Sequence, residues 1–239
     1  MRLLVTRPRD DAEAFAGILR SRGHQPVIAP VMEVHFIPGP LLPCEGVQAV
    51  LATSANGIRA LAGRTQRRDL AVYAVGPQTA EAARIAGFAS VINCDGDSAQ
   101  LVEKVAREAD PKNGMLLHAA GAETAGRVRQ ALTARGFVVE TVVLYEALPV
   151  LQLAIVAQDA LHDGTLDGVL MFSPRSAKTF STLVAEAKLS EQCAGLVAFC
   201  ISAATAEALT PLTFARLAVA GTPNQDAILD LIPAPEPVR

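Results

Sequence analysis

Short apolar runs alternate with longer segments of helical periodicity along almost the whole chain. The apolar runs are rich in Val, Leu and Ile, which is typical of strands buried on both faces of a parallel sheet. Between them, alanine-rich segments repeat apolar residues every three or four positions, as amphipathic helices do. The expected strands are 2–6, 25–34, 49–53, 72–75, 90–93, 115–118, 138–145, 168–172, 197–202 and 216–220, and the expected helices include 12–22, 79–86, 99–108, 124–135 and 205–212. Ten strands that alternate with helices predict two parallel five-stranded α/β sheets.

The second half of the chain repeats the first half with its segments in rotated order. Residues 3–33 align without a gap on residues 116–146 at an offset of 113. Residues 50–54 correspond to 169–173, and the tetrapeptide Thr-Ala-Glu-Ala occurs at both 79–82 and 205–208. A simple likeness between any two βα units is the alternative, but the repeated tetrapeptide argues against it. An α/β lobe inserted into a near-copy of itself produces this order.

The repeat predicts two flavodoxin-like α/β lobes, one inserted into the other, with a cleft between them. Lobe one should contain residues 1–35 and 150–239, and lobe two residues 41–146. The chain should cross between the lobes at 36–40 and 147–149, where Pro and Gly interrupt the pattern. Clefts between domains are preferred sites for small ligands.

Composition and charge argue against several classes of function. A net charge of −3 and a pI near 5.8 disfavour broad binding to nucleic acid. No apolar run approaches the roughly 18 residues of a membrane span, and the N-terminus becomes charged at once. The four cysteines lack CxxC spacing and nearby paired histidines, so we expect free thiols and no metal site. A soluble cytoplasmic protein without nucleic-acid or membrane partners is expected.

Motifs of nucleotide and metal enzymes are missing. No GxGxxG follows the first strand, and HExxH and GxSxG do not occur. Gly121 to Gly126 has the spacing of a P-loop, but Arg127 and Val128 follow where Lys and Ser or Thr are required. A nucleotide-dependent or metal-dependent enzyme is therefore not expected.

Five strand-to-helix turns are rich in small hydroxyl residues, at 6–8, 53–56, 76–79, 173–176 and 202–205. In a parallel sheet such turns lie at the carboxyl ends of the strands, where ligands bind. Each turn presents backbone N–H groups and the positive end of a helix dipole, which suit carboxylates or phosphates. Ordinary N-capping by Ser and Thr is the alternative for any single turn. The expected substrate contacts are Thr53, Ser54, Gly76, Thr79, Ser173, Ser202 and Thr205, with Arg7, Arg175 and Lys178 as basic helpers.

The chain resembles the uroporphyrinogen-III synthase family over nearly its whole length. The matching segments follow the family's order: 5–8, 53–57, 74–80, 143–146, 172–174 and 205–209. One departure is Ser202-Ala203, where members commonly have Gly-Pro. The resemblance implies a cofactor-independent carbon–oxygen lyase of porphyrin and heme biosynthesis. Its substrate, the linear tetrapyrrole hydroxymethylbilane, carries eight carboxylates and is closed to uroporphyrinogen III with inversion of the terminal ring and loss of water. Uncatalysed closure gives the symmetric type I isomer.

Tyr145 is the predicted catalytic residue, as a proton donor to the departing hydroxyl group. It ends the strand that returns from one lobe to the other, and a phenol is a protonated donor at neutral pH. Simple packing at the strand end is the alternative, as Met32 would pack in the other repeat. A monomer is expected, with transient contact to the enzyme of the preceding step. The competing function is a non-enzymatic two-lobed anion-binding or sensor protein, which the same turns would serve.

Overall fold

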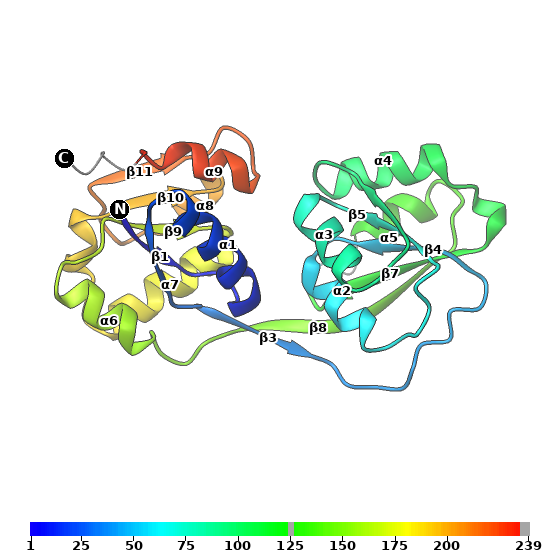
Figure 1. Cartoon of the computed structure of the whole chain (residues 1–239), viewed down its shortest axis with the longest axis horizontal. Helices are drawn as coiled ribbons and strands as arrows, with labels where there is room; N and C mark the ends of the chain where they lie inside the picture. The colour runs from blue at the N-terminus through cyan, green and yellow to red at the C-terminus, as the bar shows by residue number, and fades with distance from the viewer. Residues whose placement is uncertain (124–126, 235–239) are drawn as a thin grey trace. The chain divides into compact units, whose positions relative to one another are not determined.

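The chain divides into two α/β units, seen in a computed structural model that describes residues 1–123 and 127–234 (Figure 1). Unit 1 is Met1–Glu33 with Leu148–Arg239, and unit 2 is Val34–Ala147. Both boundaries fall inside strands, β3 (Met32–Phe36) and β8 (Val139–Pro149), which are neighbours in one sheet.

The segment 36–40, expected as the first crossing, lies within unit 2 in this division. The amide of Ile37 donates to the carbonyl oxygen of Leu144 at 2.8 Å. The guanidinium of Arg64 donates to the carbonyl oxygens of Ile37 and Pro40, at 3.1 and 2.7 Å. These hydrogen bonds attach the segment to unit 2.

The described part of unit 1 is built on a parallel sheet of five strands in the order β11-β10-β9-β1-β2. This is the flavodoxin-like order, in which the chain changes its direction of travel across the sheet between β1 and β9. The elements are β1 (Arg2–Val5), α1 (Arg9–Ser21), β2 (Gln25–Ile28), α6 (Ile155–His162), β9 (Gly168–Met171), α7 (Pro174–Glu186), η2 (Glu191–Gly195), β10 (Val197–Cys200), α8 (Ala203–Glu207), β11 (Arg216–Val219) and α9 (Gln225–Leu231).

The core of unit 1 follows from the period of its helices and strands. In α1 the apolar residues Ala12, Phe15, Ala16 and Leu19 are all buried, which is the stripe of a helix packed on a sheet. They join Leu3 and Val5 of β1, and residues of α9, in one hydrophobic cluster. The central strand β9 is buried along its whole length, as expected for a strand covered on both faces.

In residues 34–123 and 127–147, unit 2 has a sheet in the order β3-β8-β7-β4-β5-β6, in which β8 to β6 are parallel. The other elements are β4 (Val47–Ala52), α2 (Ala55–Ala62), β5 (Ala71–Ala74), α3 (Pro77–Ile85), β6 (Ser90–Asn93), α4 (Ser98–Glu108), η1 (Pro111–Asn113), β7 (Met115–Gly121) and α5 (Arg127–Thr133). The first three residues of the expected helix 124–135 lie outside the described residues.

The sheet orders of the two units match the rotated repeat in the sequence. Reading β11-β10-β9-β1-β2 against β6-β5-β4-β7-β8 pairs β1 with β7 and β9 with β4. These are the pairs that the sequence correspondence assigns. Each unit therefore has the same strand arrangement with a different starting strand, and the two-lobed α/β fold class predicted from the sequence is confirmed.

One predicted strand is wrong. Residues 25–34 were expected as a single strand, but the described residues form two, β2 and β3, so that they contain eleven strands and the second sheet has six. Pro30 lies in the break, where a residue without an N–H cannot donate to a neighbouring strand. The equivalent position in the other repeat is Val143, and there β8 continues without interruption.

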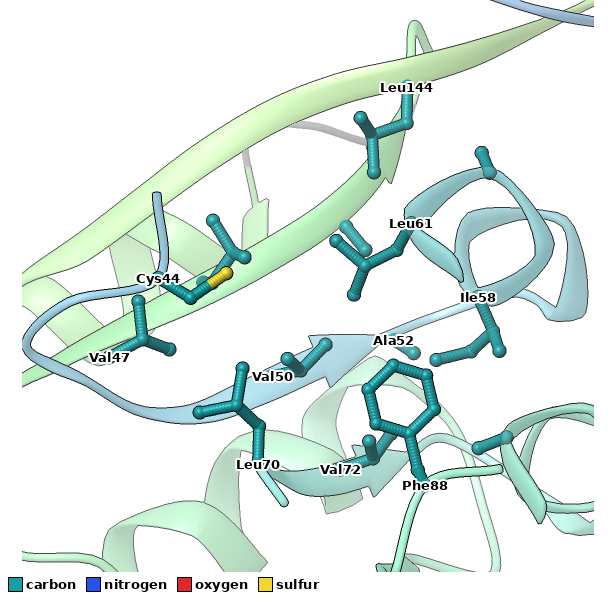
Figure 2. Packing of buried hydrophobic residues seen from close by; sticks show 14 of the residues in the cluster. Cys44, Val47, Val50, Ala52, Ile58, Leu61, Leu70, Val72, Phe88 and Leu144 are labelled. Atoms are coloured by element: carbon teal, nitrogen blue, oxygen red, sulfur yellow. The ribbon is translucent and has the colours of Figure 1, made fainter. Parts of the chain in front are cut away.

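Two hydrophobic clusters cover the two faces of the sheet in unit 2. On one face, residues of α2 and α3 pack on alternate residues of β4, β5 and β7. Figure 2 shows this cluster, in which Leu61 of α2 is drawn between Leu144 of β8 and Val50 of β4. On the other face, α4 and α5 cover Leu51, Tyr73 and Leu116. The carboxyl ends of the strands are thus held in fixed register.

Candidate functional site

The carboxyl ends of β10, β9 and β1 are neighbours at one edge of the sheet in unit 1. Thr6 follows β1, Ser173 follows β9 and Ser202 follows β10. The structure therefore brings together the three turns that the sequence analysis selected in this unit. They surround the point between β1 and β9 where ligands bind in flavodoxin-like sheets.

The serine hydroxyl groups of these turns cap their own helices. Ser173 accepts a hydrogen bond from the amide of Ser176 at 3.1 Å, and Ser202 accepts one from the amide of Thr205 at 3.3 Å. In unit 2, Ser54 accepts from the amide of Asn56 at 3.1 Å. All three serines therefore act as ordinary N-caps, which was the alternative explanation for each of these turns. Capping fixes the first turn of each helix and leaves its other N–H groups pointing past the strand end.

The threonines of the predicted site are more enclosed than its serines. Thr205 is fully buried, and its Oγ1 lies 3.0 Å from Oγ of Ser202. Thr79 is also buried in unit 2, whereas Thr53 is partly exposed. Beside Thr205, Ala203 and Ala204 in the first turn of α8 are exposed. The buried threonine hydroxyl groups therefore stabilise the turns from inside, and the neighbouring residues of the first helical turn are the ones exposed to solvent.

Arg7 is partly buried at the edge of unit 1. Its guanidinium donates to Oε1 of Gln225 at 2.9 Å and pairs with Oδ2 of Asp11 at 3.3 Å, both side chains of the ion pair being 11% exposed. It also lies over the ring of Phe172, 4.4 Å from the centroid. Arg7 thus connects the turn after β1 to α1 and α9. Of the other two predicted basic helpers, Arg175 is half-buried and Lys178 is exposed, both on α7.

In unit 2 the strands β7, β4 and β5 are adjacent, and their carboxyl ends bring together Gly121, the Thr53–Ser54 turn and the Gly76–Thr79 turn. Gly76 is the N-cap of α3 and has no side chain to occupy the amides of that helix. Pro77 takes the first helical position, where its missing N–H costs nothing. The N-terminus of α3 is therefore capped by no side chain, unlike those of α2, α7 and α8.

Tyr145 lies on β8 beside the end of β7. Its side chain is 9% exposed and belongs to the cluster on the α2 and α3 face. In the register of the two strands it stands opposite Gly121, and its carbonyl oxygen accepts from the amide of Ala122 at 3.0 Å. The phenol is therefore held at the edge of the sheet that also carries the Thr53–Ser54 turn.

His118 is a polar residue in the interior of unit 2 that the sequence analysis did not single out. It is fully buried, and neither ring nitrogen has a hydrogen-bond partner among the described residues. Burial lowers its pKa from 6.5 to about 4, because the surroundings disfavour the charged imidazolium. The imidazole is therefore neutral at physiological pH.

Sequence reasoning also missed Gly121 and Arg59. Arg59 of α2 donates to Oδ1 of buried Asn56 at 2.6 Å, close to the Ser54 cap, and adds a basic group to this edge. A glycine that closes an apolar strand was the available signal for Gly121.

Among residues 1–123 and 127–234, no three His, Cys, Asp or Glu residues are grouped so that they could hold a metal ion. In the same residues, every helix is too short or too polar to cross a membrane.

These features define a class of protein: two parallel α/β units, each with several helix N-termini at the carboxyl edge of its sheet, where anionic small molecules bind. The sequence comparison gives the particular family. The chain belongs to the uroporphyrinogen-III synthase family, since the family model described as Uroporphyrinogen-III synthase HemD matches residues 13–230. It is thus an enzyme of porphyrin biosynthesis, as predicted. Comparison with curated proteins gives no match.

Solved structures show the same fold. The uroporphyrinogen-III synthetase of Helicobacter pylori superposes with a TM-score of 0.62, is 18% identical and covers 97% of this chain and 98% of its own. A mutant uroporphyrinogen III synthase of the extremely thermophilic bacterium Thermus thermophilus gives a TM-score of 0.50 at 21% identity, covering 96% of each chain. At these identities the likeness concerns the fold alone.

Proposed function

We propose that this chain closes hydroxymethylbilane to uroporphyrinogen III as a carbon–oxygen lyase that needs no metal or cofactor. The match to the uroporphyrinogen-III synthase family over residues 13–230 carries this proposal. The turns at the strand ends support it, because a substrate with eight carboxylates requires many separate donors.

In this proposal, backbone N–H groups at the first turns of α2, α3, α7 and α8 bind the substrate's carboxylates. Each helix end contributes only about 0.3–1 kcal/mol, so several must act together. The net charge of −3 offers no diffuse attraction for a polyanion, so local donors have to supply the binding energy. Arg175 and Lys178 add positive charge at α7, and Arg7 adds its charge from a partly buried position.

Tyr145 is the proposed proton donor. The hydroxyl group on the terminal ring leaves as water when it receives a proton, and an azafulvenium cation remains. The substituted carbon of the pyrrole ring at the other end of the linear substrate attacks this cation to form a spiro intermediate, and fragmentation followed by re-closure inverts this second ring. A positioned phenol assists departure of the hydroxyl group by donating a hydrogen bond. Its place at the sheet edge that also carries the Thr53–Ser54 turn supports this role, because carboxylates bound at that edge would orient the ring toward the phenol.

The experiment supplies hydroxymethylbilane to the purified protein, oxidises the products and separates the porphyrin isomers by chromatography. We expect the type III isomer in excess over the type I isomer, with type I alone when the protein is omitted or heat-denatured. If the protein also yields only type I, while still binding the substrate, the anion-binding or sensor function is the better account. The monomeric state, the contact with the preceding enzyme and the cytoplasmic location stay predictions.

A further inference from the structure

Two consecutive residues of β8, Leu144 and Tyr145, pack in the same hydrophobic cluster. In a regular strand, neighbouring side chains point to opposite faces of the sheet. The register explains the exception: Ala120 pairs with Val143, whereas the next residue, Gly121, pairs with Tyr145. Leu144 is therefore the additional residue of a β-bulge, a feature that redirects the side chain that follows it. Here the bulge turns the phenol toward the α2 and α3 face.

The redirected phenol lies directly against the backbone of Gly121. A Cβ atom built on Gly121 would be 2.6 Å from Cζ of Tyr145, 2.8 Å from its hydroxyl oxygen and 3.0 Å from Cε2. Cβ atoms almost never approach other atoms closer than 3.0 Å, so a residue other than glycine fits at Gly121 only if the phenol moves. The absence of a side chain on Gly121 thus fixes how closely the phenol approaches the end of β7.

The backbone of Gly121 does not itself require glycine. Its φ angle is outside the left-handed region, which L-residues rarely adopt, and the residue ends a strand. Glycine weakens a strand, so its presence there needs another cause. Close approach of the Tyr145 side chain is that cause, since two ring atoms and the hydroxyl oxygen of the phenol occupy the space of a side chain.

We propose that Gly121 is a positioning residue for the reaction: its missing side chain and the bulge at Leu144 together set the Tyr145 phenol at the sheet edge that carries the Thr53–Ser54 turn. This inference rests on the proposed role of Tyr145. Any side chain at Gly121 would displace the phenol from the departing hydroxyl group. Misplacement of a catalytic group by about 1 Å can cost on the order of 100-fold in rate.

The test compares Gly121→Ala with Gly63→Ala, a matched substitution in the same unit. A Cβ at Gly63 would meet only the carbonyl oxygen of Ala60, at 3.6 Å, which is an ordinary contact. We expect Gly121→Ala to lower kcat by about 10- to 100-fold with KM almost unchanged, and Gly63→Ala to leave both as in the wild type. In a Tyr145→Phe background, Gly121→Ala should lower kcat by less than about twofold further, because the phenol is already absent. Full activity of Gly121→Ala would overturn the proposal.

A spectroscopic measurement separates positioning from a general structural effect. The chain has two tyrosines and no tryptophan, so in a Tyr73→Phe variant every tyrosine signal comes from Tyr145. The ring resonances of labelled Tyr145 should shift on Gly121→Ala and stay in place on Gly63→Ala. Unchanged resonances with Gly121→Ala would also contradict the proposal.

If Gly121→Ala does not fold, a second substitution keeps the proposal testable. Tyr145→Leu removes the two ring carbons and the hydroxyl oxygen that meet the added Cβ. The double variant Gly121→Ala with Tyr145→Leu should then fold, and its failure to fold would show that Tyr145 is not what Gly121 accommodates. A wild-type protein that makes only type I isomer would instead refute the proposed function, and the ring resonances would still test the contact.

Discussion

Lowering the pH from 7 to 5 should destabilise unit 2 through His118. The imidazole is fully buried on β7, without a hydrogen-bond partner for either nitrogen among the described residues. Its neighbours on the same face of the sheet include Leu51 and Leu116, which belong to the cluster under α4 and α5. Protonation would place a charge in these apolar surroundings, which is costly.

The direction and magnitude of this destabilisation follow from the pKa of His118 in the folded protein and in the unfolded chain. The folded pKa, about 4, is below the ordinary value of 6.5, so the unfolded chain binds the proton more strongly. Stability that is present above pH 6.5 is therefore lost as the pH falls toward 4. The whole difference corresponds to roughly 3 kcal/mol, and about 2 kcal/mol of it is lost between pH 7 and pH 5.

Urea unfolding followed by tyrosine fluorescence measures this loss. Both tyrosines, Tyr73 and Tyr145, lie in unit 2, and the chain has no tryptophan, so the signal reports this unit. Wild type should lose about 2 kcal/mol more between pH 7 and pH 5 than His118→Leu, which cannot be protonated. His162→Gln is the matched control, because His162 lies in unit 1 with a side chain 77% exposed. Equal pH dependence in wild type and His118→Leu would refute the reasoning.

Three further predictions concern the proposed site and its support. Tyr145→Phe should lower kcat by about 100-fold with the fold intact, and full activity in steady-state assays would remove Tyr145 from the mechanism. Thr79→Val and Thr205→Val should each weaken substrate binding by about fivefold, which corresponds to one hydrogen bond of about 1 kcal/mol; unchanged affinity and turnover would refute anchoring at these turns. Arg7→Met should reduce the free energy of unfolding of unit 1 by about 2–3 kcal/mol in urea titrations, since it removes both the ion pair with Asp11 and the hydrogen bond to Gln225. A stability equal to wild type would show that this ion pair contributes little.

The fold could be predicted because strands and helices alternate with clear periodicity. The rotated repeat also predicted which strands of the two units correspond, because β1 and β7 occupy the same place in their sheets. The break between β2 and β3 was missed: the run 25–34 is mostly apolar, and the effect of Pro30 depends on whether its position needs an N–H. A backbone N–H is needed only where the residue pairs with a neighbouring strand, and the local sequence pattern does not show which strand will be the neighbour.

The site was only partly accessible from the sequence. The turns were found because Ser and Thr after an apolar run mark a helix start, but a serine that caps and a serine that binds a ligand have the same local pattern. The environment of Arg7 depends on Gln225, which is 218 positions away in the chain. The contact of Gly121 with Tyr145 depends on a bulge, and no periodicity indicates where one additional residue will be accommodated.

The rotated order of the segments also has a consequence for the growing chain on the ribosome. Strand β1 is an interior strand of its sheet, between β2 and β9, yet Gly168 of β9 is paired with Leu3 and is synthesised 165 residues later. At about 5–20 residues per second, the first βαβ segment waits roughly 8–33 s for this partner. Unit 2 is continuous in the chain and emerges complete during that interval. We therefore expect unit 2 to fold first, while the apolar face of α1 and β1 is exposed to chaperones until the last third of the protein has been made.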